Sequence, residues 1–221
     1  MTTRAKGDRP SGPEHSLERL IFFSDAVFAI AITLLIIEVH VPDLPPGSPH
    51  HAYLEALWHL IPNFFGFIVS FFVIGAFWAA HHRMFGLAAH YSERLVGANL
   101  MVLCLIVFMP FATAFMSANT GTLVPSVLYA ATLLLTGLFN RRLMFIVTSA
   151  PVVAADVSPE MIAYVRARSG TVIFGALCAL LIAFIDPRFS QMGLLTIPIW
   201  QRLFLRRVDR QVARKARAAA A

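Results

Sequence analysis

Apolar residues fill long stretches of this chain, and the charged residues gather between them. Runs without any charged side chain cover residues 26–37, 56–82, 95–140, 143–155, 169–185 and 189–201. One transmembrane helix needs about 17–25 mostly apolar residues, so the run 95–140 is long enough for two. Its middle, residues 117–125, is rich in the turn formers Asn, Thr, Gly and Pro. The pattern therefore predicts an all-α membrane protein with six transmembrane helices, over residues 19–40, 54–82, 92–117, 123–148, 168–185 and 189–206.

The ends of the chain differ from this central domain. Residues 1–18 are polar and predict a tail, residues 19–206 form the six-helix domain, and residues 207–221 form a basic tail. The first apolar segment is too long for a secretory signal, so we expect it to be retained. The sixth helix fits the pattern least well, because Pro198 interrupts a short uncharged stretch. A re-entrant or interfacial segment is the alternative there.

Composition excludes a soluble protein. Hydrophobic residues make up 58% of the chain and charged residues 14%, against about 25% charged in soluble domains. The net charge of +6 does not indicate nucleic-acid binding, because the basic residues lie at the edges of apolar segments. With six crossings and a cytoplasmic N-terminus, every Lys and Arg except Arg188 falls on the inner side. We therefore expect both termini to be cytoplasmic.

The first predicted helix carries an acid that needs a partner. An Asp at the centre of a membrane helix costs about 2.5–3.5 kcal/mol, so Asp25 should face protein or water. Arg19 lies on a different side of the same helix. The end of the second helix offers Trp78 and His81 on one face, and an N–H of either side chain can satisfy the carboxylate. This polar cluster either locks helices together or takes part in gating or proton relay.

One face of the first helix is almost free of charge. On a helical wheel Phe23, Ala26, Ile30, Leu34 and Ile37 form a stripe, with Thr33 on its flank. By itself this periodicity favours a lipid-facing or packing surface and does not reveal a pore.

The segment from Arg19 to Glu38 resembles a known family. Arg19, Phe23, Ser24 and Asp25 match the R-x-x-x-F-S-D signature of the transmembrane protein 175 family of potassium channels, and the following A-I-T-L-L run also matches. Trp78 and His81 resemble the end of that family's second helix, and the six-helix pattern resembles its repeat. The later helices match it in length and polarity but in few specific residues.

The resemblance implies a potassium-preferring cation channel. The first helix of each subunit would line the pore, with Ile30, Leu34 and Ile37 as a hydrophobic constriction and Thr33 as a hydroxyl layer linked to potassium preference. Arg19, Phe23, Ser24 and Asp25 would be structural, together with Trp78 and His81. A single repeat implies a homotetramer in the lipid of a prokaryotic cell membrane, with potassium as the permeant ion.

Physical chemistry is compatible with this interpretation and leaves alternatives. Apolar rings can close a pore by dewetting, a hydroxyl ring can replace part of an ion's hydration shell, and the outer acids Glu38, Asp43 and Glu55 can concentrate cations. A proton-coupled or proton-conducting transporter is the alternative, because Asp25, His59, His81 and His82 lie within or near the helices.

Enzyme chemistry has little support in the sequence. No H-E-x-x-H, nucleophile elbow or phosphate loop occurs, so we expect no catalysis, no metal site and no cofactor. The sequence also lacks a T-V-G-Y-G stretch, which argues against a potassium channel with a carbonyl filter.

Overall fold

The computed structural model describes residues 13–219, and the regular structure within them is helical apart from one isolated bridge between Ala88 and Val153. The chain forms α1 (Pro13–Ile37), α2 (His50–His59), α3 (Ile61–Phe85), α4 (Glu93–Ala118), α5 (Leu123–Val147), α6 (Pro159–Ser169), α7 (Thr171–Ile185), the 3₁₀ segment η1 (Pro187–Thr196) and α8 (Ile197–Ala219).

Five segments in the described part of the chain are long and apolar enough to cross a membrane. They are His15–Ile37, Ile61–Phe85, Glu93–Ala118, Leu123–Val147 and Pro159–Ile185. The fifth consists of α6 and α7, which meet at Gly170. The predicted turn between the third and fourth spans is present, and Gly121 adopts a φ of 81° there. These findings describe a multi-pass, all-helical membrane protein.

The sixth span predicted over residues 189–206 is not present as one apolar helix. Its first part belongs to η1, which folds along α7, and its second part belongs to the basic helix α8. Gly193 explains the close approach, because a Cβ there would overlap the backbone of Ala179 on α7. The Ser190 hydroxyl also donates to the Ala179 carbonyl at 3.0 Å. The close packing of η1 against α7 thus divides a segment that hydropathy alone predicts to be one helix.

Helical structure extends into both predicted tails. Helix α1 begins at Pro13, before the boundary expected at residue 19, and proline is well suited to a first helical position. Helix α8 runs through the predicted basic tail to Ala219. Residues 1–12 and 220–221 of these tails lie outside the described part of the chain.

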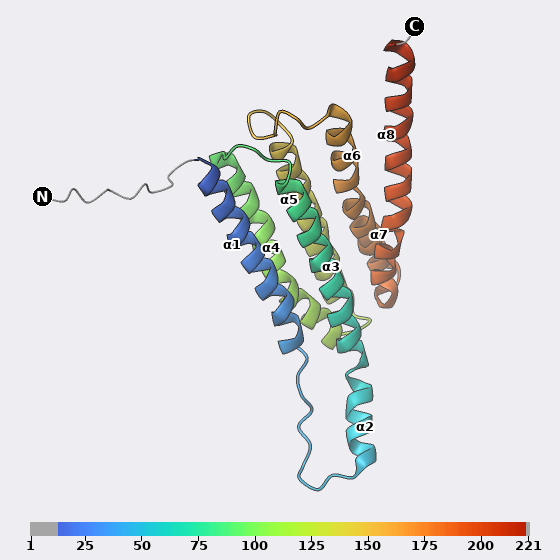
Figure 1. Ribbon diagram of the computed structural model, residues 1–221. Coiled ribbons are helices and arrows are strands. Elements are labelled where there is room, and N and C mark those ends of the chain that lie inside the picture. The colour runs from blue at the N-terminus through green and yellow to red at the C-terminus, as the bar shows by residue number, and fades with distance from the viewer. Residues whose placement is uncertain (1–12, 220–221) are drawn as a thin grey trace, which may run out of the picture.

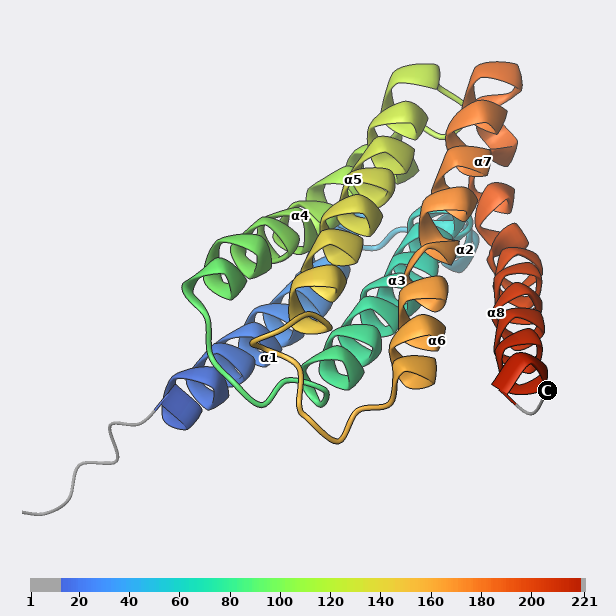
Figure 2. The ribbon, with the colours of Figure 1, turned by 90° about the horizontal axis from the view of Figure 1, so that it is seen from above.

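The helices form an antiparallel bundle (Figure 1), in which α1 starts and α8 ends toward the same end of the molecule. Helix α2 and the loop before it extend beyond the opposite end. Viewed from above, α1 and α8 lie on opposite sides of the bundle (Figure 2). Half of the apolar windows of α4 and α5 is buried, against 22% for α1. The core therefore centres on α4 and α5, and α1 lies at its margin.

A polar cluster ties three of the core helices together. The Ser70 hydroxyl on α3 lies 3.1 Å from the Tyr129 hydroxyl on α5, and Thr113 on α4 lies 2.8 Å from Ser70. At the end of the bundle that holds the start of α1, the loops after α3 and α5 join through the Ala89 N–H, which donates to the Val152 carbonyl at 2.9 Å. These contacts hold α3 in place, and α3 carries Trp78 and His81 of the candidate site.

Candidate functional site

Helix α1 has two distinct faces. Its buried residues recur every three or four positions and pack against α3 and α4: Leu17, Leu20, Ser24, Phe28, Ala31 and Leu35. The stripe identified from the sequence lies on another side of the helix and stays uncovered within the chain. Ile30 is 57% exposed and Ile37 68% exposed, and Phe23, Ala26, Thr33 and Leu34 are exposed as well. This stripe does not pack within its own chain, so it faces lipid or other copies of the chain.

Thr33 interrupts the apolar character of this surface with a hydroxyl. The hydroxyl donates to the Ile30 carbonyl at 2.8 Å, within the helix itself. Because its proton is used in this bond, the oxygen lone pairs are left for whatever lies on the exposed side. A cation is a suitable partner for such an oxygen.

Asp25 finds the partner that the sequence predicted on α3. The Trp78 indole Nε1 donates to the Asp25 Oδ1 at 2.9 Å. The bond joins the middle of α1 to the second half of α3. It satisfies one carboxylate oxygen and confirms the expected contact between the two helices.

His81 belongs to a second, fully buried chain of hydrogen bonds. Its Nε2 lies 2.8 Å from Asn99 Oδ1 on α4, the Asn99 amide donates to the Ser24 hydroxyl at 2.8 Å, and Ser24 donates to the Leu20 carbonyl at 2.8 Å. His81 is 1% exposed, and Ser24 and Asn99 are 0% exposed. The three helices α1, α3 and α4 are therefore joined by one polar network in an apolar core.

Asn99 was missed in the sequence, and a signal for it existed. It is a polar residue inside an uncharged run, where an amide without a partner costs free energy. Four-residue spacing could have placed it on the same face as Leu95 and Leu103, both of which are buried.

Arg19 and Phe23 do not join this network. Both are exposed, and together with Leu20, Tyr91 and Val96 they line a shallow depression between α1 and the start of α4. Two of the signature residues, Ser24 and Asp25, are thus hydrogen-bonded to other helices. The other two, Arg19 and Phe23, are exposed within the chain.

The predicted outer acids lie at the end of the bundle away from the start of α1. Glu38 follows α1, Asp43 lies in the next loop and Glu55 lies on α2 (Figure 1). Asp43 and Glu55 are exposed, and the ion pairs found within residues 13–219 include none of the three. Within the same residues, no group of three or more His, Cys, Asp or Glu side chains is arranged to hold a metal ion.

Part of the chain is similar to proteins of a known family. Residues 19–110 match the model of the family described as endosomal/lysosomal potassium channel TMEM175. A protein named as a potassium channel in Streptomyces collinus is 43% identical over 100 residues, which is 45% of this chain and 47% of the relative. A protein from Gallus gallus named as an endosomal/lysosomal proton channel, TMEM175, is 37% identical over 103 residues, 44% of this chain and 20% of the relative.

The similarity in structure extends further along the chain. A solved structure of a lysosomal potassium-selective channel TMEM175 homolog from Chamaesiphon minutus superimposes with a TM-score of 0.72 and 26% identity, over 88% of this chain and 98% of that one. The sequence matches span about half the length of the bacterial relatives. Residues 19–110 of this chain are therefore similar in sequence to the TMEM175 family, and the fold is similar to that of a TMEM175 homolog over most of the chain.

Proposed function

We propose that the chain is one subunit of a homotetrameric, potassium-preferring cation channel that conducts ions passively. The first helix, α1, of each subunit would line the pore, and η1 with α8 would complete a sixth crossing. The observation that carries this proposal is the uncovered stripe of α1, which faces away from the residues that pack the helix into its own chain. The names of the relatives, potassium and proton channels, support the class.

Ile30, Leu34 and Ile37 supply the constriction in this proposal. They span roughly 10 Å of one helix face, which is room for stacked rings when four copies meet around an axis. Rings of large aliphatic side chains close a narrow pore by excluding water. Thr33, whose proton is held by the Ile30 carbonyl, adds a ring of oxygen acceptors that can replace part of the hydration shell of potassium.

The two ends of the bundle differ in charge, and this difference predicts how the pore is oriented in the membrane. The basic residues gather at the end where α1 starts, and Glu38, Asp43 and Glu55 lie at the other. In a cell membrane the basic end would be cytoplasmic, with both termini inside. The acidic end would then attract cations to the outer mouth.

Proton conduction is the second candidate, and two observations favour it. Several relatives carry the name proton channel, and His81 is a buried imidazole whose Nδ1 has no hydrogen-bond partner within residues 13–219. His81 on α3 and Asn99 on α4 lie against the packed side of α1, away from the exposed stripe. A proton path through it would run inside one subunit.

Ion flux from liposomes that contain the purified protein tests both candidates. We expect potassium flux that exceeds sodium flux, needs no proton gradient and grows steadily with the potassium gradient. Flux that appears only with a proton gradient and saturates would favour a proton-coupled transporter. The variant His81→Gln separates the second candidate, because it should leave potassium flux intact and abolish proton flux only if the imidazole carries protons.

A further inference from the structure

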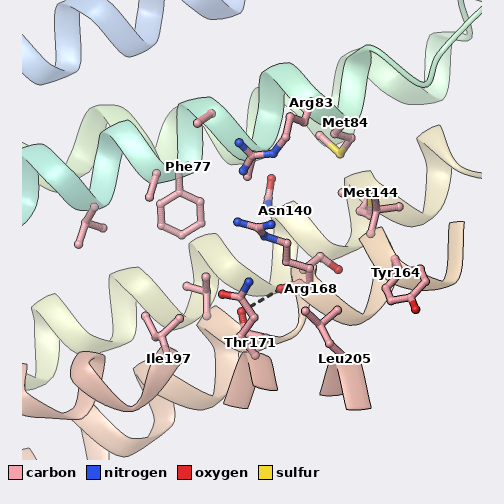
Figure 3. Close-up of a pocket in the computed structure, with 18 of the residues that line it drawn as sticks. Phe77, Arg83, Met84, Asn140, Met144, Tyr164, Arg168, Thr171, Ile197 and Leu205 are labelled. Carbon is pink, nitrogen blue, oxygen red and sulfur yellow. Dashed lines mark hydrogen bonds between the residues drawn. The ribbon is translucent and has the colours of Figure 1, made fainter. Parts of the chain in front are cut away.

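A cleft of about 510 Å³ opens between α3, α5, α6, α7 and α8, on the side of the bundle away from α1. Figure 3 shows its walls. Apolar side chains predominate, among them Val73, Ala76, Phe77, Leu133, Ile197 and Leu205. The volume lies within the range of about 300–1,000 Å³ that is typical of ligand pockets. None of the residues that line the cleft belongs to the hydrogen-bonded network of α1 or to its exposed stripe. The cleft and the network share only helix α3.

Two arginines face the middle of this cleft. Arg83 comes from the last turn of α3 and Arg168 from the last turn of α6, and Figure 3 shows both guanidinium groups directed inward on either side of Asn140. No Asp or Glu lines the cleft, and no ion pair to either arginine occurs within residues 13–219. Arg141 and Arg166 nearby differ, because each donates to a carbonyl and lies over the Phe145 ring.

Asn140 gives an independent sign of a ligand. The residue is only 6% exposed, and its Oδ1 has no hydrogen-bond partner in the described part of the chain. A buried amide without a partner costs roughly 1–3 kcal/mol. A polar group placed between Arg83 and Arg168 would lie next to this amide and could satisfy it.

We propose that the cleft binds one anionic phospholipid. Its phosphate lies between Arg83 and Arg168, a hydroxyl of its headgroup or glycerol reaches Asn140, and an acyl chain lies along Phe77 and Leu133. The charges favour this occupant because two arginines that form no ion pair within residues 13–219 line the cleft beside its apolar wall. Phosphates of the inner leaflet would lie at the same basic end of the bundle. The proposal does not depend on ion conduction.

Native mass spectrometry of the intact, detergent-solubilised oligomer tests it, with dioleoylphosphatidylglycerol and dioleoylphosphatidylcholine titrated separately. We expect tighter binding of the anionic lipid. The double variant Arg83→Gln, Arg168→Gln should weaken that binding about tenfold or more, because each cation near a lipid phosphate contributes about fivefold. Arg142→Gln, which removes an exposed arginine outside the cleft at the same end of α5, should change it less than about twofold.

Two further probes separate the other occupants. Ala76→Phe fills the apolar part without altering charge, so the anionic lipid should bind weakly while the oligomer stays intact. Glycerol 3-phosphate, which lacks acyl chains, should compete poorly. Equal binding of the two lipids, an unaffected double variant, strong competition by glycerol 3-phosphate, or loss of the oligomer in Ala76→Phe would each overturn the proposal. The last result would assign the cleft to a second copy of the chain.

Discussion

Helices α1, α3 and α4 are joined by hydrogen bonds between side chains, whereas α5, α7 and η1 are joined by close contacts between small residues. In the first region Asp25, Ser24, Trp78, His81 and Asn99 reach across helices. In the second, the buried side of α7 consists of Thr171, Gly175, Ala176, Ala179 and Ala183. Small residues every three or four positions let membrane helices approach closely. The helices of the first region are therefore held together by polar side chains, and those of the second region by close approach of their backbones.

The hydrogen-bonded region coincides with the part of the chain that the family model matches. The family model covers residues 19–110, which include the whole hydrogen-bonded network. Polar residues in an apolar helix have few acceptable substitutes, because each change leaves a partner without a bond. Small residues that merely permit contact form a weaker signature, and the second region falls outside the matched part.

Gly193→Ala should have the largest effect on stability and tests the second region. The added Cβ would overlap the backbone of Ala179, so the free energy of unfolding in mixed detergent micelles should fall by about 3 kcal/mol. Gly75→Ala is the matched control: nothing lies within 4 Å of its Cβ position, and it should stabilise α3 by about 0.5–1 kcal/mol. Equal effects of the two changes would mean that α7 and η1 are not packed this closely.

Asn99→Ala tests the first region and should destabilise the protein by about 2 kcal/mol. The change leaves His81 Nε2 and the Ser24 hydroxyl without the bonds that Asn99 provides. Asn119→Ala is the control, because Asn119 is exposed in the turn after α4 and bonds only the Phe115 carbonyl. Unfolding curves that coincide for the two variants would show that the buried network contributes little.

Asp25→Ala should cost about 1 kcal/mol, and Trp78→Phe should cost a similar amount because it removes the same bond. The double variant should then cost little more than either single variant. We expect a smaller assembled fraction by size-exclusion chromatography, with conduction retained in the oligomers that form. Glu18→Ala, which removes an exposed acid on the same helix, serves as control. Normal assembly with no conduction would instead assign the carboxylate to gating or permeation.

Thr33→Ala should have the smallest effect on stability, within about 0.5 kcal/mol, because Thr33 is exposed and bonds only its own helix. Its effect should appear in selectivity, as a roughly threefold lower preference for potassium over sodium in flux assays. An unchanged preference would remove the hydroxyl layer from the proposal.

The sequence predicted the helical class, the first five spans and a contact from Asp25 to Trp78 or His81, because hydropathy and a buried charge act locally. It did not predict that residues 189–206 are divided between η1 and α8, because the fold of η1 depends on the close approach of Gly193 to Ala179 on another helix. Asn99 and the cleft around Asn140 also escaped prediction. Their significance depends on which helices are neighbours, and neutral amides and terminal arginines have no periodic pattern that reveals this.

The most direct test of the central proposal compares potassium flux through Ile30→Asn with flux through Ile36→Asn in liposomes. Both residues are exposed on α1, but they lie about 120° apart around the helix, and only Ile30 belongs to the stripe. If the stripe lines the pore, Ile30→Asn should admit water, raise flux at least about tenfold and weaken selectivity, while Ile36→Asn should resemble the unaltered protein. Equal flux in all three proteins, each shown to be folded and assembled, would contradict a pore lined by this face of α1.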